Sequence, residues 1–204
     1  QFYASDATYD LSTYELDVDG VSEILMPPVT IEPDSSHIRI LANGKMERLH
    51  NAFMWVDTET ITDYDFYNAE LDIHSGGRFT GTATFDYIDL EGEIQPIHFS
   101  TLEKKGDLVK GVAYIKEEDN FHLDPYFGFK GKVLLDSSKD FLTFDGYTRI
   151  HLACDKLNRA WIPFKDEVDP EDVFIDLNPE VRLTDRQQWH AGIMISHGPT
   201  LCYP

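Results

Sequence analysis

Phe79-Thr80-Gly81-Thr82-Ala83-Thr84-Phe85 is the stretch that decides the fold class of this chain. Apolar and polar residues alternate along it with period two, and it is rich in threonine and aromatic residues, as half-buried β-strands are. The same alternation recurs at residues 14–18, 37–41, 69–74, 108–115 and 141–150. Turn-forming pairs such as Asp19-Gly20 and Asn43-Gly44 separate these stretches. The sequence therefore predicts an all-β chain, built as an antiparallel sandwich or a curved, jelly-roll-like sheet.

Glycine recurs at one place in these strands. The pattern is an apolar residue, any residue, glycine, three residues and a second apolar residue, and its five copies centre on Gly20, Gly81, Gly111, Gly131 and Gly146. A glycine inside a strand weakens it unless it permits a bulge, a bend or close packing. The pattern predicts a row of bends in one curved sheet. The alternative is that similar hairpins recur by chance.

Length and composition predict one large domain. A chain of 204 residues forms one large domain or two small ones. A composition shift predicts a β meander or jelly-roll core over residues 1–152 and an irregular extension over 153–204, packed on the same domain. Between residues 155 and 185 the alternation fades and three prolines intervene. Asn178-Pro179-Glu180 resembles a helix start and predicts a short helix over residues 179–189.

Charge excludes several functions. The formal net charge is −20, from 37 acidic and 17 basic residues. Such a chain repels phosphate backbones, so nucleic-acid binding is disfavoured. Clusters of basic residues that attract anionic membranes are absent, and no apolar run approaches the roughly 18 residues of a membrane helix. Most acids fall at outward strand positions such as Asp17 and Glu70 or in turns, which is typical of the solvated side of a β protein.

The compartment is predicted to be extracytoplasmic, either periplasmic or at the cell surface. The chain begins at Gln1, so it is either a mature chain after leader cleavage or a segment of a longer protein. Its two cysteines, Cys154 and Cys202, are either two buried thiols or one disulfide. A disulfide would favour an oxidising compartment.

One family resemblance accompanies these patterns. Residues 7–21 resemble the hairpin repeat of OstA-type periplasmic modules of lipopolysaccharide transport, and residues 31–52 are compatible with the hairpins that follow. Residues 121–150 resemble β-rich portions of large envelope proteins of the Bacteroidota. The resemblance implies a non-catalytic module, so no catalytic residue is carried over. The irregular region after His151 departs from the OstA-type pattern.

No cofactor is predicted, and calcium is the one candidate that the acidic loops suggest. Oxygen-rich loops suit this hard cation, and the candidate ligands are Glu117, Glu118 and Asp119 in one loop and Asp169, Glu171 and Asp172 in another. Solvated loops that aid solubility are the alternative. Residues 15–20 imitate the start of an EF-hand, but Met26 stands where that loop needs a carboxylate. The eight histidines show no metal-binding spacing.

Aromatic residues suggest a second kind of site. A sugar-stacking or lipid-facing surface could be formed by Trp55, Tyr64, Tyr67, Trp161 and Trp189. Packing in the core and across strands is the alternative. The chain has no Gly-x-Ser-x-Gly elbow and no phosphate-binding loop, so no catalytic activity is expected. Its 37 acids make any carboxylate pair uninformative.

The sequence thus predicts a non-catalytic extracytoplasmic β module with a structural, assembly or partner-binding role in a larger envelope protein. The partner would be another protein or an adjacent module of the same chain. Exposed sheet edges would support this function, because a neighbour could continue the sheet. A carbohydrate- or lipid-binding domain is one alternative, and a glycan-active enzyme is another.

Overall fold

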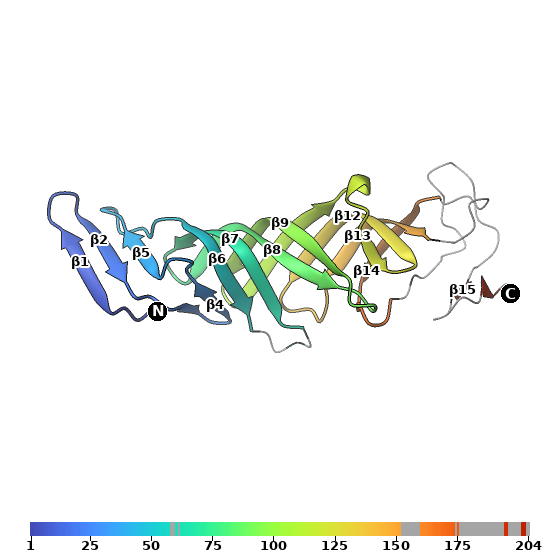
Figure 1. The fold of residues 1–204 in the computed structure, drawn as a ribbon, viewed down its shortest axis with the longest axis horizontal. Helices are drawn as coiled ribbons and strands as arrows, with labels where there is room; N and C mark the ends of the chain where they lie inside the picture. Colours follow the sequence, from blue (N-terminus) through green and yellow to red (C-terminus); the bar gives the residue numbers. More distant parts are fainter. Residues whose placement is uncertain are drawn as a thin grey trace. The chain divides into compact units, whose positions relative to one another are not determined.

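The fold is known here from a computed structural model, which describes residues 1–57, 60, 62–151, 160–173 and 175 and the backbone of residues 194–195 and 201–202. Its regular elements are strands apart from one 3₁₀ turn, η1 (Glu117–Asp119), and the strands pair antiparallel (Figure 1). The predicted all-β antiparallel class is therefore confirmed. The chain forms two compact units. The first comprises Gln1–Tyr87, Ile94–Tyr114 and Val133–Leu142, and the second comprises Ile88–Glu93, Ile115–Lys132 and Thr143–Pro204.

The first unit contains two sheets. The smaller has the order β1 (Asp6–Asp10), β2 (Glu15–Asp19), β5 (His37–Ile40). The larger runs through β3 (Ile24–Met26), β4 (Val29–Glu32), β6 (Leu49–Val56), β7 (Tyr64–His74), β8 (Arg78–Ile88), β9 (Ile94–Lys105) and β10 (Leu108–Ile115). Its strand order follows the chain, with only β5 leaving to join the small sheet. This is the order of a meander, in which short turns connect neighbouring strands.

The core of the first unit is built from alternating inward side chains. The ring of Phe66 on β7 lies 5.8 Å from the ring of Phe85 and 5.8 Å from that of Phe99. Two β-bulges interrupt the alternation, one at Asn51 and one at Asn68, each with a φ of 50°. The register of β6 against β7 and of β7 against β8 shifts at these points. Each bulge therefore changes which side chains face the core.

The second unit is also built from antiparallel strands. It contains β11 (His122–Asp124), the first part of β12 (Phe127–Asp136), β13 (Thr143–Ile150) and β14 (Ile162–Glu167). The ring of Phe129 lies 5.0 Å from that of Phe144 and 6.5 Å from that of Phe164. These contacts make a small aromatic core between β12, β13 and β14.

Strand β14 lies in the stretch that the sequence predicts to be irregular. It pairs with β13 from Thr143↔Glu167 to Thr148↔Ile162. Only Ile162 and Phe164 point inward from it, and two buried positions are too short a pattern to mark a strand by periodicity. Beyond it, β15 (Met194–Ile195) pairs with β16 (Leu201–Cys202). The predicted helix over residues 179–189 lies outside the described residues.

The five glycines of the recurring pattern lie where the chain has no room for a side chain. A Cβ added to Gly111 would lie 2.8 Å from Leu102 Cδ1, and one added to Gly131 would lie 2.6 Å from Gly146 Cα. At the other pattern glycines it would press on neighbouring backbone or side-chain atoms just as closely. The turn glycines at positions 44, 76, 77, 92 and 106 have nothing within 4 Å of that point. The pattern therefore marks places where strands approach closely.

Candidate functional site

One edge of the small sheet is open. Strand β2 lies in the middle, and the outer side of β5 is occupied because Glu47 N–H donates to Arg39 O at 2.7 Å and Leu41 N–H donates to Lys45 O at 2.8 Å. Among the described residues, none pairs with the outer side of β1. All five side chains of β1 are exposed. The backbone of β1 is thus available to an incoming strand.

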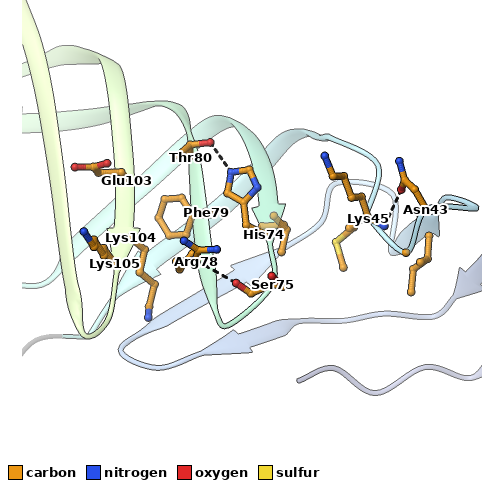
Figure 2. A pocket seen from close by; sticks show the side chains of 14 residues that line it. Asn43, Lys45, His74, Ser75, Arg78, Phe79, Thr80, Glu103, Lys104 and Lys105 are labelled. Carbon is orange, nitrogen blue, oxygen red and sulfur yellow. Dashed lines mark hydrogen bonds between the residues drawn. The ribbon is translucent and has the colours of Figure 1, made fainter.

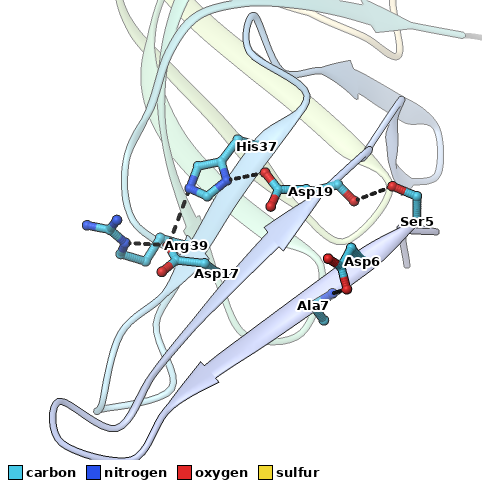
Figure 3. A network of polar contacts seen from close by, with 7 residues as sticks. All are labelled: Ser5, Asp6, Ala7, Asp17, Asp19, His37 and Arg39. Atoms are coloured by element: carbon cyan, nitrogen blue, oxygen red, sulfur yellow. Dashed lines mark hydrogen bonds and ion pairs between the residues drawn. The ribbon is translucent and has the colours of Figure 1, made fainter.

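On one face of this sheet, the β5 side chains His37 and Arg39 lie beside acids of β2 (Figure 3). Register places Asp19 opposite His37 and Asp17 opposite Arg39. Asp17 Oδ1 lies 2.7 Å from Arg39 Nε and 3.3 Å from His37 Nε2. Asp19 Oδ1 lies 2.8 Å from His37 Nδ1. Asp17 and Asp19 therefore have partners on the β5 side.

On the other side of β2, acid faces acid. Asp6 of β1 lies opposite Asp19, and Asp10 lies opposite Glu15. Like charges directly opposite one another destabilise a strand pair. No described cation forms an ion pair with Asp6 or Asp10. The face therefore carries Arg39 and His37 on β5 followed by two rows of acids, the second of which lies on the open edge.

Both β1 carboxylates are held by local hydrogen bonds. Asp6 Oδ1 accepts the N–H of Ala7 at 2.8 Å (Figure 3). Asp10 Oδ1 accepts the hydroxyl of Ser12 at 2.6 Å and its N–H at 2.7 Å. The hydrogen bonds from Ser12 hold the pKa of Asp10 below its ordinary value, so this carboxylate is charged at neutral pH.

The opposite face of the small sheet is apolar, and its side chains become more exposed from β5 to β1. Ile38 on β5 and Val18 on β2 are buried, and Leu16 on β2 is half-buried. Tyr9 of β1 lies opposite Leu16 and is 52% exposed. The apolar face therefore ends uncovered at the same strand that carries the unpaired acids.

The first unit also contains a pocket of about 790 Å³, a volume typical of ligand sites (Figure 2). The turn around Asn43-Gly44, the β7–β8 turn and the end of β9 line it. Its charged lining residues are Lys45, Arg78, Glu103, Lys104 and Lys105, and His74 also lines it. Cations therefore outnumber acids on this surface, although acids outnumber cations in the whole chain.

Of the predicted aromatic site residues, the structure brings two to one face. Trp55 on β6 is 41% exposed, and Tyr67 on β7 shares its face of the sheet. The hydroxyl of Tyr67 donates to Asp86 Oδ1 at 2.8 Å, which raises the pKa of Tyr67. Tyr64 is 1% exposed and packs in the core, the alternative role for an aromatic residue. Trp189 lies outside the described residues.

Trp161 belongs to a charged cluster of the second unit. Its indole N–H donates to Glu117 Oε1 at 3.3 Å. Lys130 Nζ lies 4.3 Å and Arg149 Cζ 4.5 Å from the centre of the ring, as in cation–π contacts. Both cations also reach Glu117, Lys130 at 2.7 Å and Arg149 at 3.6 Å. The cluster thus joins Trp161, predicted as a ligand-binding residue, to Glu117, predicted as a calcium ligand.

Replacing Glu117 with glutamine is expected to make the second unit less sensitive to acid. The Lys130 hydrogen bond holds the pKa of Glu117 below its ordinary value of 4.5; burial opposes this, and the Trp161 indole adds to it. A lowered folded-state pKa stabilises the fold above pH 4.5, and that stabilisation is lost as pH falls through the folded-state pKa. Acid titration of tryptophan fluorescence measures the change. Glu118→Gln is the control, and equal behaviour of the two variants would contradict the prediction.

Three of the other predicted calcium ligands have local partners. Glu118 Oε1 lies 3.2 Å from Lys116 Nζ, and Asp119 Oδ2 accepts the backbone N–H of Lys116 at 2.7 Å. Asp169 Oδ1 accepts the N–H of Glu171 at 2.9 Å. Across the described ranges, no three or more His, Cys, Asp or Glu side chains gather as metal ligands do. The calcium site stays a prediction.

Sequence reasoning named exposed sheet edges only in general, did not identify β1 as the open edge, and missed the cations of the pocket. The acids of β1 alternate with apolar residues, but the sequence does not show which strand ends a sheet. The pocket cations come from three turns or strand ends far apart in the chain. The signal that points to both is a charge without an opposite partner, which only the folded chain reveals.

Comparison with family models, with curated proteins and with solved structures finds no match to this chain. The resemblance to OstA-type modules therefore stays a prediction. In the part of the chain that the structure describes, no helix has the length and apolar character needed to span a membrane. Cys154 lies outside the described residues, as does the side chain of Cys202.

Proposed function

We propose that this chain is a non-catalytic β module that binds a protein partner by adding an extended segment of that partner to β1. The partner is another protein or an adjacent module of a larger extracytoplasmic envelope protein. The observation that supports this function is the open edge of β1, with its unpaired acids on one face and its uncovered apolar residues on the other. Strand addition uses backbone hydrogen bonds for affinity and alternate side chains for specificity.

The charge rows define the chemistry of the partner strand. A fourth strand beside β1 would place its side chains opposite Asp6 and Asp10, where cations would supply the opposite charge that Asp17 obtains from Arg39 of β5. Residues four apart on a strand share a face. The matching segment therefore has Lys or Arg at its first and fifth positions. Its second and fourth positions are apolar and would cover the face of the sheet that contains Tyr9.

A second copy of this chain fits the edge poorly. Two β1 strands paired antiparallel about Thr8 would place Asp6 of each copy against Asp10 of the other. Both pairs would join like charges, which destabilises strand pairing. The edge therefore favours a basic partner over self-association.

A charge-swap experiment tests the proposed function. A short peptide containing Lys-Val-Thr-Val-Lys is expected to bind the wild-type chain at least about tenfold more tightly than its Glu-Val-Thr-Val-Glu counterpart, because two cross-strand charge pairs change sign. The variant Asp6→Lys/Asp10→Lys is expected to reverse that preference. Isothermal titration calorimetry measures both affinities. A preference that the variant leaves unchanged would overturn the proposal.

Two controls separate strand addition from general charge attraction. Glu23→Lys/Asp34→Lys changes the net charge equally at exposed positions away from β1 and is expected to keep the wild-type preference. A lysine peptide with N-methylated backbone cannot donate the ladder hydrogen bonds and is expected not to bind. Equal binding of the methylated peptide would show that charge alone holds the peptide.

A further inference from the structure

We infer that the pocket of the first unit, called the basic pocket below, binds a small molecule with two or more oxyanion groups. The inference is separate from strand addition, because the pocket lies at the turns of residues 43–46 and 74–80 and at the end of β9, and none of its lining residues belongs to β1. It depends on where the cations without acid partners lie.

Most described cations have a carboxylate within ion-pair distance. These are Arg39, Arg48, Lys110, Lys116, Lys130, Arg149 and Lys165. Lys45, Arg78, Lys104 and Lys105 form no ion pair with any described residue, and all four line the basic pocket. The chain has 37 acids, yet four cations that line one cavity have no carboxylate partner among the described residues. The cavity therefore carries positive charge that no described acid neutralises. Clefts lined by one sign of charge concentrate ligands of the opposite sign.

The ammonium of Lys104 is buried without a carboxylate partner in the described part of the chain. Lys104 is 5% exposed, and its ammonium donates to the carbonyl oxygens of Gly77, at 3.2 Å, and of Gly106. Carbonyl oxygens satisfy its hydrogen bonds but carry no full negative charge. A buried charge without a counter-charge is unfavourable. An anion in the basic pocket would reduce that cost.

The cations stand on different sides of the basic pocket. Figure 2 shows Lys45 on one side, Lys104 and Lys105 on the other, and Arg78 between them. Arg78 Nε donates to Ser75 O at 3.2 Å, so the terminal nitrogens of the guanidinium stay available for an anion. A single small anion would contact the cations on one side of the basic pocket only. A ligand with two separate anionic groups would contact the cations on both sides.

The remaining lining residues indicate the chemical character of the uncharged part of the ligand. Ile40, Met46 and Ile73 contribute apolar surface, and Glu103 is the only acid among the lining residues. Apolar lining with a few charged groups is typical of small-molecule sites. The basic pocket therefore fits phosphate, sulfate or carboxylate groups attached to a compact apolar body.

Calorimetry with pyrophosphate, citrate and inorganic phosphate, at an ionic strength held constant with chloride, tests the inference. Pyrophosphate or citrate is expected to bind more tightly than inorganic phosphate, and which of the two binds tells phosphate chemistry from carboxylate chemistry. The variant Lys45→Gln/Lys105→Gln is expected to weaken binding at least about tenfold, since each lysine supplies a charge-assisted contact. Lys104 is left unchanged, because its contacts hold two turns.

The matched control is Lys116→Gln/Lys165→Gln, which removes the same charge from ion-paired positions of the second unit. It is expected to keep the wild-type affinity. Equal weakening in the two double variants, or no binding of pyrophosphate and citrate to the wild-type chain, would overturn the inference. The variant Asp6→Lys/Asp10→Lys is expected to bind the anion as the wild type does, so failure of strand addition and failure of this site are distinguishable.

Discussion

Replacing Gly81 with alanine is expected to lower the free energy of unfolding by about 1–3 kcal/mol, the range for forcing an atom into a filled space. Gly81 of β8 lies opposite Leu71 of β7. A Cβ at Gly81 would press on the carbonyl oxygen of Glu70, which is part of the backbone and cannot rotate away. The two strands must therefore separate. Urea unfolding followed by circular dichroism measures the loss.

The control for this prediction is Gly92→Asn. Gly92 has a φ of 82° and nothing within 4 Å of an added Cβ. Asparagine tolerates this left-handed conformation, so the free energy of unfolding should change by no more than about 0.5 kcal/mol. If both variants unfold at the same urea concentration, the close approach of β7 and β8 is not what Gly81 provides.

Replacing Phe66 with alanine is expected to lower the free energy of unfolding by about 3–5 kcal/mol. The side chain is 2% exposed, and its ring contacts the rings of Tyr64, Phe85 and Phe99. Its removal loses buried apolar surface and leaves a cavity among rigid rings. Since whole domains are stable by only about 5–15 kcal/mol, the variant should unfold at a much lower temperature. Calorimetry measures the change.

Phe53→Ala is the matched control, because Phe53 lies on β6, next to β7, and faces solvent. Its removal should change the free energy of unfolding by no more than about 0.5 kcal/mol. A loss as large as that of Phe66→Ala would mean that the exposed face of β6 is covered in the folded chain. Trp55, which lies on the same face of β6, would then have a packing role and not a ligand-binding one.

Most strands that the sequence predicts contain a stretch of unbroken alternation. The stretch from Phe79 to Phe85 lies wholly within β8. Strands β6 and β9 escape detection because each changes phase. In β9 the buried positions pass from Phe99 to Leu102, and the pairing with β10 shifts there as well. A period-two search reads such a step as the end of a strand, whereas the chain continues through it.

The candidate sites are harder to predict because they depend on neighbours distant in the chain. The acids of β1 resemble those of β2, and only the strand order separates Asp6, without a cation, from Asp17, which pairs with Arg39. Lys45 and Lys105 approach the same cavity from different hairpins.

The crowded glycines also act as a check on strand pairing. A slip of two residues between β7 and β8 would keep every apolar side chain facing inward, so alternation alone does not forbid it. Such a slip would bring Phe79 or Ala83 opposite Leu71, in the place of Gly81. Either side chain would collide with the Glu70 carbonyl. The absence of a Cβ at Gly81 therefore favours the observed β7–β8 register over slipped registers that bury the same apolar side chains.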